Sequence, residues 1–291
     1  MIEPAVALGY LEHLGPADLR LLARVAGDSP EVLRSRPDRL VALLGAPATE
    51  ADVLRPAPDE DPFLRASPFL AFAVAVHRSA ATLERATSTL EWVGPRQRLP
   101  VFDVAPLRAF LADPLRRLFL VELLASFTSV SSGSTWERTR RGWRRRRFSE
   151  LDPVRLASLL EVVPEAERPG VYRRLGDLAL FLTGVFPDHT AERALGPLDA
   201  GRLVHLLVAG EGTAAGPPPD DSHLGTVGLL EHLGARWYRC AAAATPASPT
   251  ATARVLPAAG DRFRQARRIL NLVSESSIFP LPASAFGLPG P

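Results

Sequence analysis

Prolines at the start of helix-like segments constrain this fold more than any other feature of the sequence. The 291 residues include 28 prolines, and proline fits the first turn of a helix but not its interior or a central strand. Proline begins "PADLRLLARVAG" (16–27), and it follows a serine in "SPEVLRSRPDRLVALLG" (29–45) and "SPFLAFAVAVHRSAATLERAT" (67–87). Serine is a preferred helix N-cap, so these patterns predict short helices begun by proline, with Pro37 dividing the second segment in two.

Helical patterns continue along most of the chain, and one stretch departs from them. In "TLEWVGPRQRLPVFD" (89–103), two runs typical of strands flank a turn, and Pro100 suits an edge strand. The prediction is therefore an all-α protein, a multi-helix bundle with one short β-hairpin near residues 89–102. We also expect a helix junction at Asp113–Pro114, an N-cap at Asp152 and a helix end at Pro187.

The last predicted helical segment, residues 250–276, is amphipathic. Its apolar residues recur every three or four positions, and four arginines fall largely on other faces. We expect these arginines to face solvent: Arg262, Arg264, Arg267 and Arg268.

Two domains are expected from changes in composition. Residues 1–56 form a small N-terminal helical module, and residues 57–291 form the main helical domain. The Pro-rich, acidic stretch "PAPDEDP" (56–62) is typical of a linker. The Pro-rich C-terminal tail at 277–291 cannot continue a helix and is expected to be extended.

Composition narrows the classes of protein and of chemistry. Hydrophobic residues make up 46% of the chain, yet no apolar run approaches the roughly 18–20 residues of a transmembrane segment. The N-terminal residues do not follow the pattern of a secretory signal, so we expect a cytoplasmic protein. The single cysteine rules out an intrachain disulfide and a cysteine zinc cluster.

All 34 basic residues are arginine and none is lysine. This excludes a P-loop lysine, a Schiff-base lysine and a Ser-Lys dyad. Together with the abundant Ala, Pro and Gly, it indicates a GC-rich coding bias.

We find no catalytic motif, and the six histidines have no metal-ligand spacing. The sequence therefore predicts no metal and no cofactor, and it favours a non-catalytic regulatory or interaction protein. The alternative is an enzyme or small-ligand-binding protein with a pocket between apolar helices. That pocket would use His77 as an acid–base group and the i,i+4 pair Arg173 and Asp177, with Tyr172 beside them.

Residues 136–148 carry most of the positive charge. This segment holds seven arginines and one glutamate, a charge of +6, while the whole chain is at +2. The other 27 arginines and 31 acids therefore leave the rest of the chain at −4. The residues predicted to bind a polyanion are Trp136, Arg138, Arg140, Arg141, Trp143, Arg144, Arg145, Arg146 and Arg147.

The seven-residue spacing of Trp136 and Trp143 favours a helix, on which both would lie on nearly one face. On a single strand the odd spacing would put them on opposite faces. Gly142 would cost such a helix about 1 kcal/mol relative to alanine.

Three roles remain open for the segment. It can face water or dock on acidic residues of its own chain, among them Asp59, Glu60, Asp61, Glu161, Glu165 and Glu167. It can bind nucleic acid, with arginines on phosphates and tryptophans on unpaired bases. It can also dock an acidic protein or an anionic membrane surface.

Overall fold

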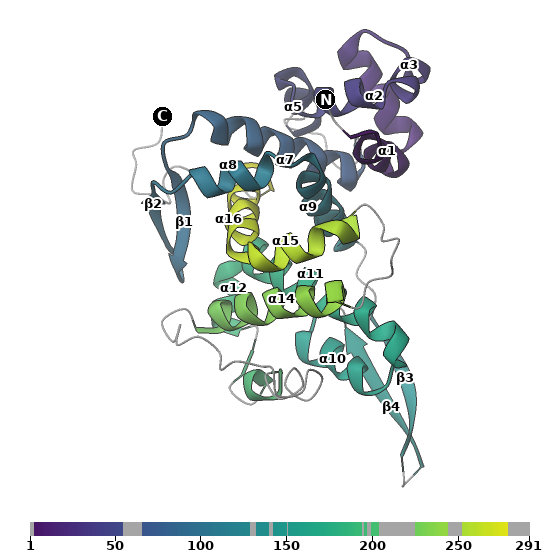
Figure 1. Ribbon diagram of the computed structural model, residues 1–291, viewed down its shortest axis with the longest axis vertical. Helices are drawn as coiled ribbons and strands as arrows, with labels where there is room; N and C mark the ends of the chain where they lie inside the picture. The colour runs from purple at the N-terminus through teal and green to yellow at the C-terminus, as the bar shows by residue number, and fades with distance from the viewer. Residues whose placement is uncertain are drawn as a thin grey trace, which may run out of the picture. The chain divides into compact units, whose positions relative to one another are not determined.

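The computed structural model describes residues 3–54, 66–128, 132–139, 142–149, 151–193, 195–196, 199–203, 225–243 and 252–278 (Figure 1). For the strands within 132–149, only the backbone is described. Contacts divide the chain into two compact units. Unit 1 comprises Met1–Glu91, Leu99–Ala125 and Arg268–Pro291, and unit 2 comprises Trp92–Arg98 and Ser126–Arg267.

The boundary expected at residue 56 falls inside unit 1, and a separate 1–56 module stays a prediction. The expected linker at 56–62 lies outside the described residues. Of the tail at 277–291, only the first two residues are described.

Unit 1 is built from helices that mostly begin at proline (Figure 1). They are α1 (Pro4–His13), α2 (Pro16–Ala26), α3 (Pro30–Ser35), α4 (Pro37–Leu44), α5 (Pro47–Leu54), α7 (Pro68–Arg85), α8 (Ala105–Leu111) and α9 (Pro114–Ser126). Helix α7 is its centre, because α4, α5 and α8 all pack on it. The side chains of Leu70, Val74 and Val76 on α7 are fully buried.

Unit 2 centres on two long helices, α11 (Arg168–Val185) and α14 (Gly225–Ala243), which lie side by side. Around them are β3 (Ser132–Thr139), β4 (Gly142–Ser149), α10 (Pro153–Ala157), α12 (Pro187–Arg193) and α15 (Leu256–Asp261). Helix α16 (Phe263–Val273) begins in unit 2, continues into unit 1, and ends in a π-helical turn at Ser274–Ile278.

Helices α11 and α14 approach closely at two glycines. A Cβ atom on Gly176 would lie 2.6 Å from ring carbons of Tyr238. A Cβ atom on Gly234 would lie 2.9 Å from the Cβ of Ala179 on α11 and 2.5 Å from the ring of Phe263 on α16. Real Cβ contacts are longer than this, so only glycine permits this spacing of the two helices.

The single helix expected within residues 250–276 was wrong, because the helix is interrupted at Arg262, between α15 and α16. Several other predicted helix boundaries are confirmed. Helix α3 ends at Ser35 and α4 begins at Pro37. The side chain of Ser67 accepts a hydrogen bond from the Leu70 amide, and that of Asp152 accepts from two amides of α10. The expected breaks at Asp113–Pro114 and at Pro187 separate α8 from α9 and α11 from α12.

The all-α class and the predicted hairpin are also confirmed. Strands β1 (Thr89–Gly94) and β2 (Gln97–Val101) form a two-stranded sheet. Asp188 on α12 holds the turn between them. Its Oδ1 accepts hydrogen bonds from the Trp92 indole (2.8 Å) and the Arg96 amide (2.7 Å), and its Oδ2 pairs with Arg98 Nη2 at 3.0 Å.

Arg96 has a positive φ of 58°, a conformation that costs a non-glycine residue energy. Burial alone would raise the pKa of Asp188. Hydrogen bonds from Arg98, Arg96 and Trp92 and the charge of Arg98 outweigh it and hold that pKa below its usual value.

The expectation of a helix at 136–148 was wrong. Residues Ser132–Thr139 and Gly142–Ser149 instead form an antiparallel pair of strands. The described residues thus contain a second hairpin beyond the predicted one. Threonine and aromatic residues at 135, 136, 139, 143 and 148 suit strands, and Gly142 disfavours a helix.

The solvated arginine face expected on α16 was wrong at two positions. Arg267 and Arg268 are only 4% and 7% exposed. Arg267 Nε lies 2.8 Å from Glu231 within unit 2, and Arg268 Nε lies 2.6 Å from Glu91 within unit 1. Each buried guanidinium thus has a carboxylate partner, as a buried charge requires.

None of the helices in the described part of the chain is both long enough and apolar enough to cross a bilayer.

Candidate functional site

Strands β3 and β4, here called the ribbon, place the two tryptophans on the same face. Trp136 pairs with Arg145, and Trp143 pairs with Arg138. Residues directly opposite each other share a face, and so do alternate residues along a strand. Trp136, Arg138, Trp143 and Arg145 therefore share what we call the tryptophan face.

The ribbon's other face has a different composition. Its register pairs Glu137 with Arg144 and Thr135 with Arg146. Arg147 pairs with Ser134 on the tryptophan face. That face thus carries three arginines and no acid, and the opposite face carries two arginines and the only glutamate. Of the residues predicted to bind a polyanion, Arg140 and Arg141 lie outside the described residues.

The ribbon leads into α10, which β4 contacts (Figure 1). Asp152 caps α10 and also pairs with Arg155 at 2.9 Å. A cavity of about 490 Å³ opens here, and its lining mixes charges of both signs. The charged and ionisable lining residues are Asp152, Arg155, His189, Asp199 and Arg202, beside apolar residues that include Leu151 and Leu182.

His77 lies in the core of unit 1 and is hydrogen-bonded to Tyr10. The Tyr10 hydroxyl and His77 Nε2 are 2.9 Å apart, and the side chains are 0% and 6% exposed. Burial, together with the nearby charge of Arg117, lowers the pKa of His77 to about 3. Burial also raises the pKa of Tyr10. The pair is therefore neutral at physiological pH.

Tyr172, Arg173 and Asp177 lie together on α11 in unit 2. The expected i,i+4 ion pair is present, with Arg173 Nε 3.9 Å from Asp177 Oδ2. The hydroxyl of Tyr238 donates a hydrogen bond to Asp177 Oδ1 at 2.9 Å. Burial, with the charge of Asp177, raises the pKa of Tyr238 well above its usual value. Asp177 thus ties α11 to α14.

The four residues proposed for the alternative pocket divide between the two units. Both of its acid–base groups already have a tyrosine partner: His77 has Tyr10, and Asp177 has Tyr238. A shared pocket for His77 and Asp177 stays a prediction.

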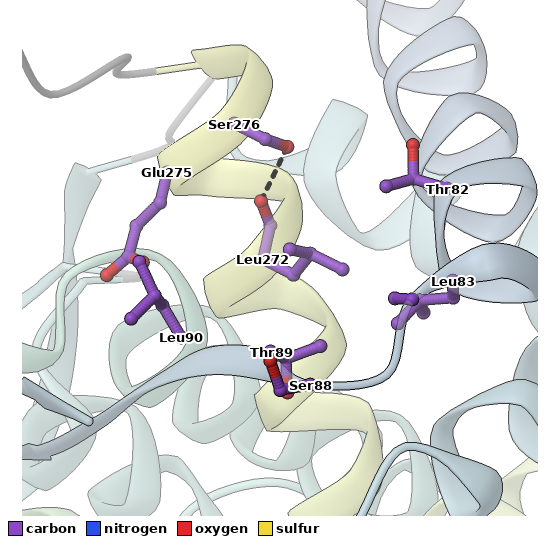
Figure 2. Close-up of a pocket in the computed structure, with 9 residues that line it drawn as sticks. Thr82, Leu83, Ser88, Thr89, Leu90, Leu272, Glu275 and Ser276 are labelled. Atoms are coloured by element: carbon purple, nitrogen blue, oxygen red, sulfur yellow. Dashed lines mark hydrogen bonds between the residues drawn. The ribbon is translucent and has the colours of Figure 1, made fainter. Parts of the chain in front are cut away.

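A separate pocket of about 250 Å³ lies in unit 1, between the end of α7, the start of β1 and the end of α16 (Figure 2). Leucines and hydroxyl-bearing side chains line it, and Glu275 supplies a carboxylate. Figure 2 shows Glu275 and Ser276 on the π-helical turn, with the Ser276 hydroxyl donating to the Leu272 carbonyl at 2.7 Å. The lining residues are Thr82, Leu83, Ala86, Ser88, Thr89, Leu90, Leu272, Glu275 and Ser276.

The chemistry of this pocket suits a small, partly apolar molecule that donates hydrogen bonds. Its hydroxyls are partly engaged already, since Thr89 donates to Glu91 at 2.9 Å. No group of three His, Cys, Asp or Glu side chains that could hold a metal occurs among the described residues.

Sequence reasoning missed the tyrosine partners and this pocket. Tyr10 is 67 residues from His77, and Tyr238 is 61 residues from Asp177. Both tyrosines lie in apolar helical segments whose pattern indicates only burial. The pocket joins segments near residues 85 and 275, and no local signal connects them.

Comparison of the chain with known protein families, with curated proteins and with solved structures found no match.

Proposed function

We propose that this protein is a non-catalytic regulatory or interaction protein that binds nucleic acid through the ribbon. The observation that carries the proposal is the register of β3 and β4, which gathers both tryptophans and three arginines on one face. Arginine stays charged at every physiological pH and binds phosphate with two parallel hydrogen bonds.

The tryptophans favour nucleic acid over an acidic protein. A chain of carboxylates needs only the arginines, whereas a nucleic acid offers phosphates and flat bases together. The ribbon is also narrow enough for the DNA major groove, which admits a two-stranded β-ribbon. The predicted pocket for an enzyme gains no supporting observation, because its acid–base groups already have tyrosine partners.

Salt dependence of binding tests the proposal. The probe is a DNA duplex titrated against the full chain at several salt concentrations. With about five to seven phosphates neutralised, the slope of log K against log[salt] is expected to be about −5 to −6. Replacing Arg144–Arg147 by serine should make this slope less steep by about 3 to 4.

A matched control removes the same charge elsewhere. Arg20, Arg24, Arg34 and Arg36 are exposed on or beside α2 and α3, and their replacement by serine should leave the slope unchanged. Salt-insensitive binding, or failure to bind both the duplex and a DNA single strand at low salt, overturns the proposal. So does binding to anionic vesicles or to poly-glutamate without binding to DNA.

A third measurement separates binding from docking within the chain. Glu165 and Glu167 are exposed in unit 2 and could accept the arginines. In that case Arg144–Arg147→Ser would lower the free energy of unfolding and leave DNA affinity unchanged. If the ribbon binds DNA, the same replacement should weaken DNA binding and leave the free energy of unfolding unchanged.

A further inference from the structure

We infer that the tryptophan face binds unpaired nucleic acid and that Trp136 and Trp143 each stack on a base. This inference rests on the proposed function and narrows its partner to single-stranded DNA or RNA. It is carried by the positions of the two tryptophans relative to each other and to the arginines.

The register makes the two tryptophans diagonal neighbours. Trp143 lies two residues before Arg145, the partner of Trp136. Diagonal neighbours on one face of an antiparallel pair are about 7–8 Å apart. Two indoles at this spacing can stack on neighbouring bases of one nucleic-acid strand.

Each tryptophan also has arginines close at hand. Trp136 has Arg145 opposite it and Arg138 two positions along its own strand, and Trp143 has Arg138 opposite and Arg145 along its strand. Stacking sites alternating with cations match a single strand, in which bases alternate with phosphates.

A duplex cannot use this arrangement as it stands. Its bases are already stacked on each other and paired, and taking one out of the stack costs a few kcal/mol. The indoles therefore add affinity for a single strand but little for a duplex. The arginines can bind the phosphates of a single strand and of a duplex alike.

Intrinsic fluorescence gives a direct reading of stacking. The chain has four tryptophans, and Trp92 and Trp237 are 4% and 1% exposed. Quenching by a nucleic acid therefore reports on Trp136 and Trp143. The probe is a thymidine oligonucleotide of about 12 nucleotides, within the site sizes of single-strand-binding modules, alone or hybridised to its complement.

We expect the single strand to quench the fluorescence and the duplex to bind with little quenching. Trp136→Ala and Trp143→Ala should each weaken single-strand binding about 5- to 150-fold, the range for loss of one stacked base. Neither should change the salt slope or duplex affinity. Trp136→Phe and Trp143→Phe keep an aromatic face and should lose less.

A control of equal charge compares the two faces. Arg138→Ser with Arg145→Ser removes two cations from the tryptophan face, and Arg144→Ser with Arg146→Ser removes two from the opposite face. The first pair should weaken single-strand binding more and reduce the quenching. Circular dichroism and the melting temperature of each variant show whether it is folded.

The possible outcomes separate the two proposals. Equal affinity for both probes without quenching, or wild-type affinity in the tryptophan variants, overturns the stacking inference. The proposed function then stands if Arg144–Arg147→Ser still reduces the salt slope for the duplex. If neither the single strand nor the duplex binds at low salt, both the stacking inference and the proposed function are overturned.

Discussion

Tyr10 on α1 and His77 on α7 share a hydrogen bond of 2.9 Å in the interior of unit 1. Burial keeps His77 neutral and lowers its pKa to about 3, from an ordinary value of 6.5. Between these two values the unfolded chain holds a proton that the folded chain does not.

His77 should therefore make the protein less stable in mild acid. Because the unfolded state binds the extra proton, stability is fully present above pH 6.5 and falls as the pH drops toward 3. The expected contribution is about 1.4 kcal/mol of unfolding free energy per pH unit in that window. Urea unfolding at several pH values measures it.

His77→Gln keeps a polar side chain beside Tyr10 but removes the titration. The variant should be less stable than the wild type at pH 7 and should lose less stability on acidification. Parallel pH profiles for the two proteins would contradict the assignment of a neutral, buried histidine.

Asp188→Asn should loosen the β1–β2 turn. The substitution removes the charge that pairs with Arg98 and one of the two carboxylate oxygens that accept hydrogen bonds. We expect a loss of about 1 kcal/mol at neutral pH, the net value of one hydrogen bond. The loss is small because the Asp188 side chain is 37% exposed, so solvent screens its charge.

The stability that Asp188→Asn loses should also depend on pH. The pKa of Asp188 is lowered in the folded state, so its contribution is present above the unfolded value near 3.9 and is lost as the pH falls through the folded value. The difference between wild type and Asp188→Asn should shrink below about pH 4. A constant difference would show that the charge contributes nothing.

Gly176→Ala should destabilise unit 2, because the new methyl group would lie 2.6 Å from the Tyr238 ring. We expect a loss of about 1–3 kcal/mol, the usual cost of overpacking a core. Gly170→Ala is the matched control on the same helix, since nothing lies within 4 Å of its new Cβ. The control should be neutral or stabilising by about 0.4–1 kcal/mol, and calorimetric melting compares the two.

Equal melting temperatures for Gly176→Ala and Gly170→Ala would contradict the close approach of α11 and α14.

Glu91→Gln should lower the free energy of unfolding, because it removes a carboxylate partner of the buried Arg268. Arg268 is 7% exposed, and besides Glu91 it pairs with Asp103 Oδ2 at 3.3 Å and donates to the backbone oxygen of Asp103 at 2.7 Å. Removing the sole partner of a buried charge costs about 3–5 kcal/mol, and because Asp103 remains beside Arg268 we expect a smaller loss. Replacing both residues by apolar ones, Glu91→Leu with Arg268→Met, should cost less than Glu91→Gln alone. Chemical denaturation ranks the variants, and the opposite order would contradict the prediction.

Local chemistry explains why much of the helical framework could be predicted. Proline and the Ser67 cap act within one turn, so the start of α7 can be read from a few neighbouring residues. Arg268 shows the limit, because its carboxylate partner Glu91 is 177 residues away. A helical pattern can indicate which residues share a face, but not which distant carboxylate reaches that face.

The ribbon shows a different limit. The seven-residue spacing of the tryptophans fits a helix, and it also fits two strands joined by a short turn. Pairing with a second strand decides between the helix and the hairpin. The residue pattern of one segment does not show whether such pairing occurs. Assigning the candidate site thus depended on the register more than on the composition of the segment.

The ribbon also has a symmetry of its own. Each strand carries the triplet Trp-x-Arg, at 136–138 and at 143–145, and the strands run in opposite directions around the pair Glu137–Arg144. A local two-fold axis through that pair exchanges Trp136 with Trp143 and Arg138 with Arg145. The four residues therefore present the same pattern after a half turn, and a strand of nucleic acid would meet equivalent contacts whichever way its 5′ end points.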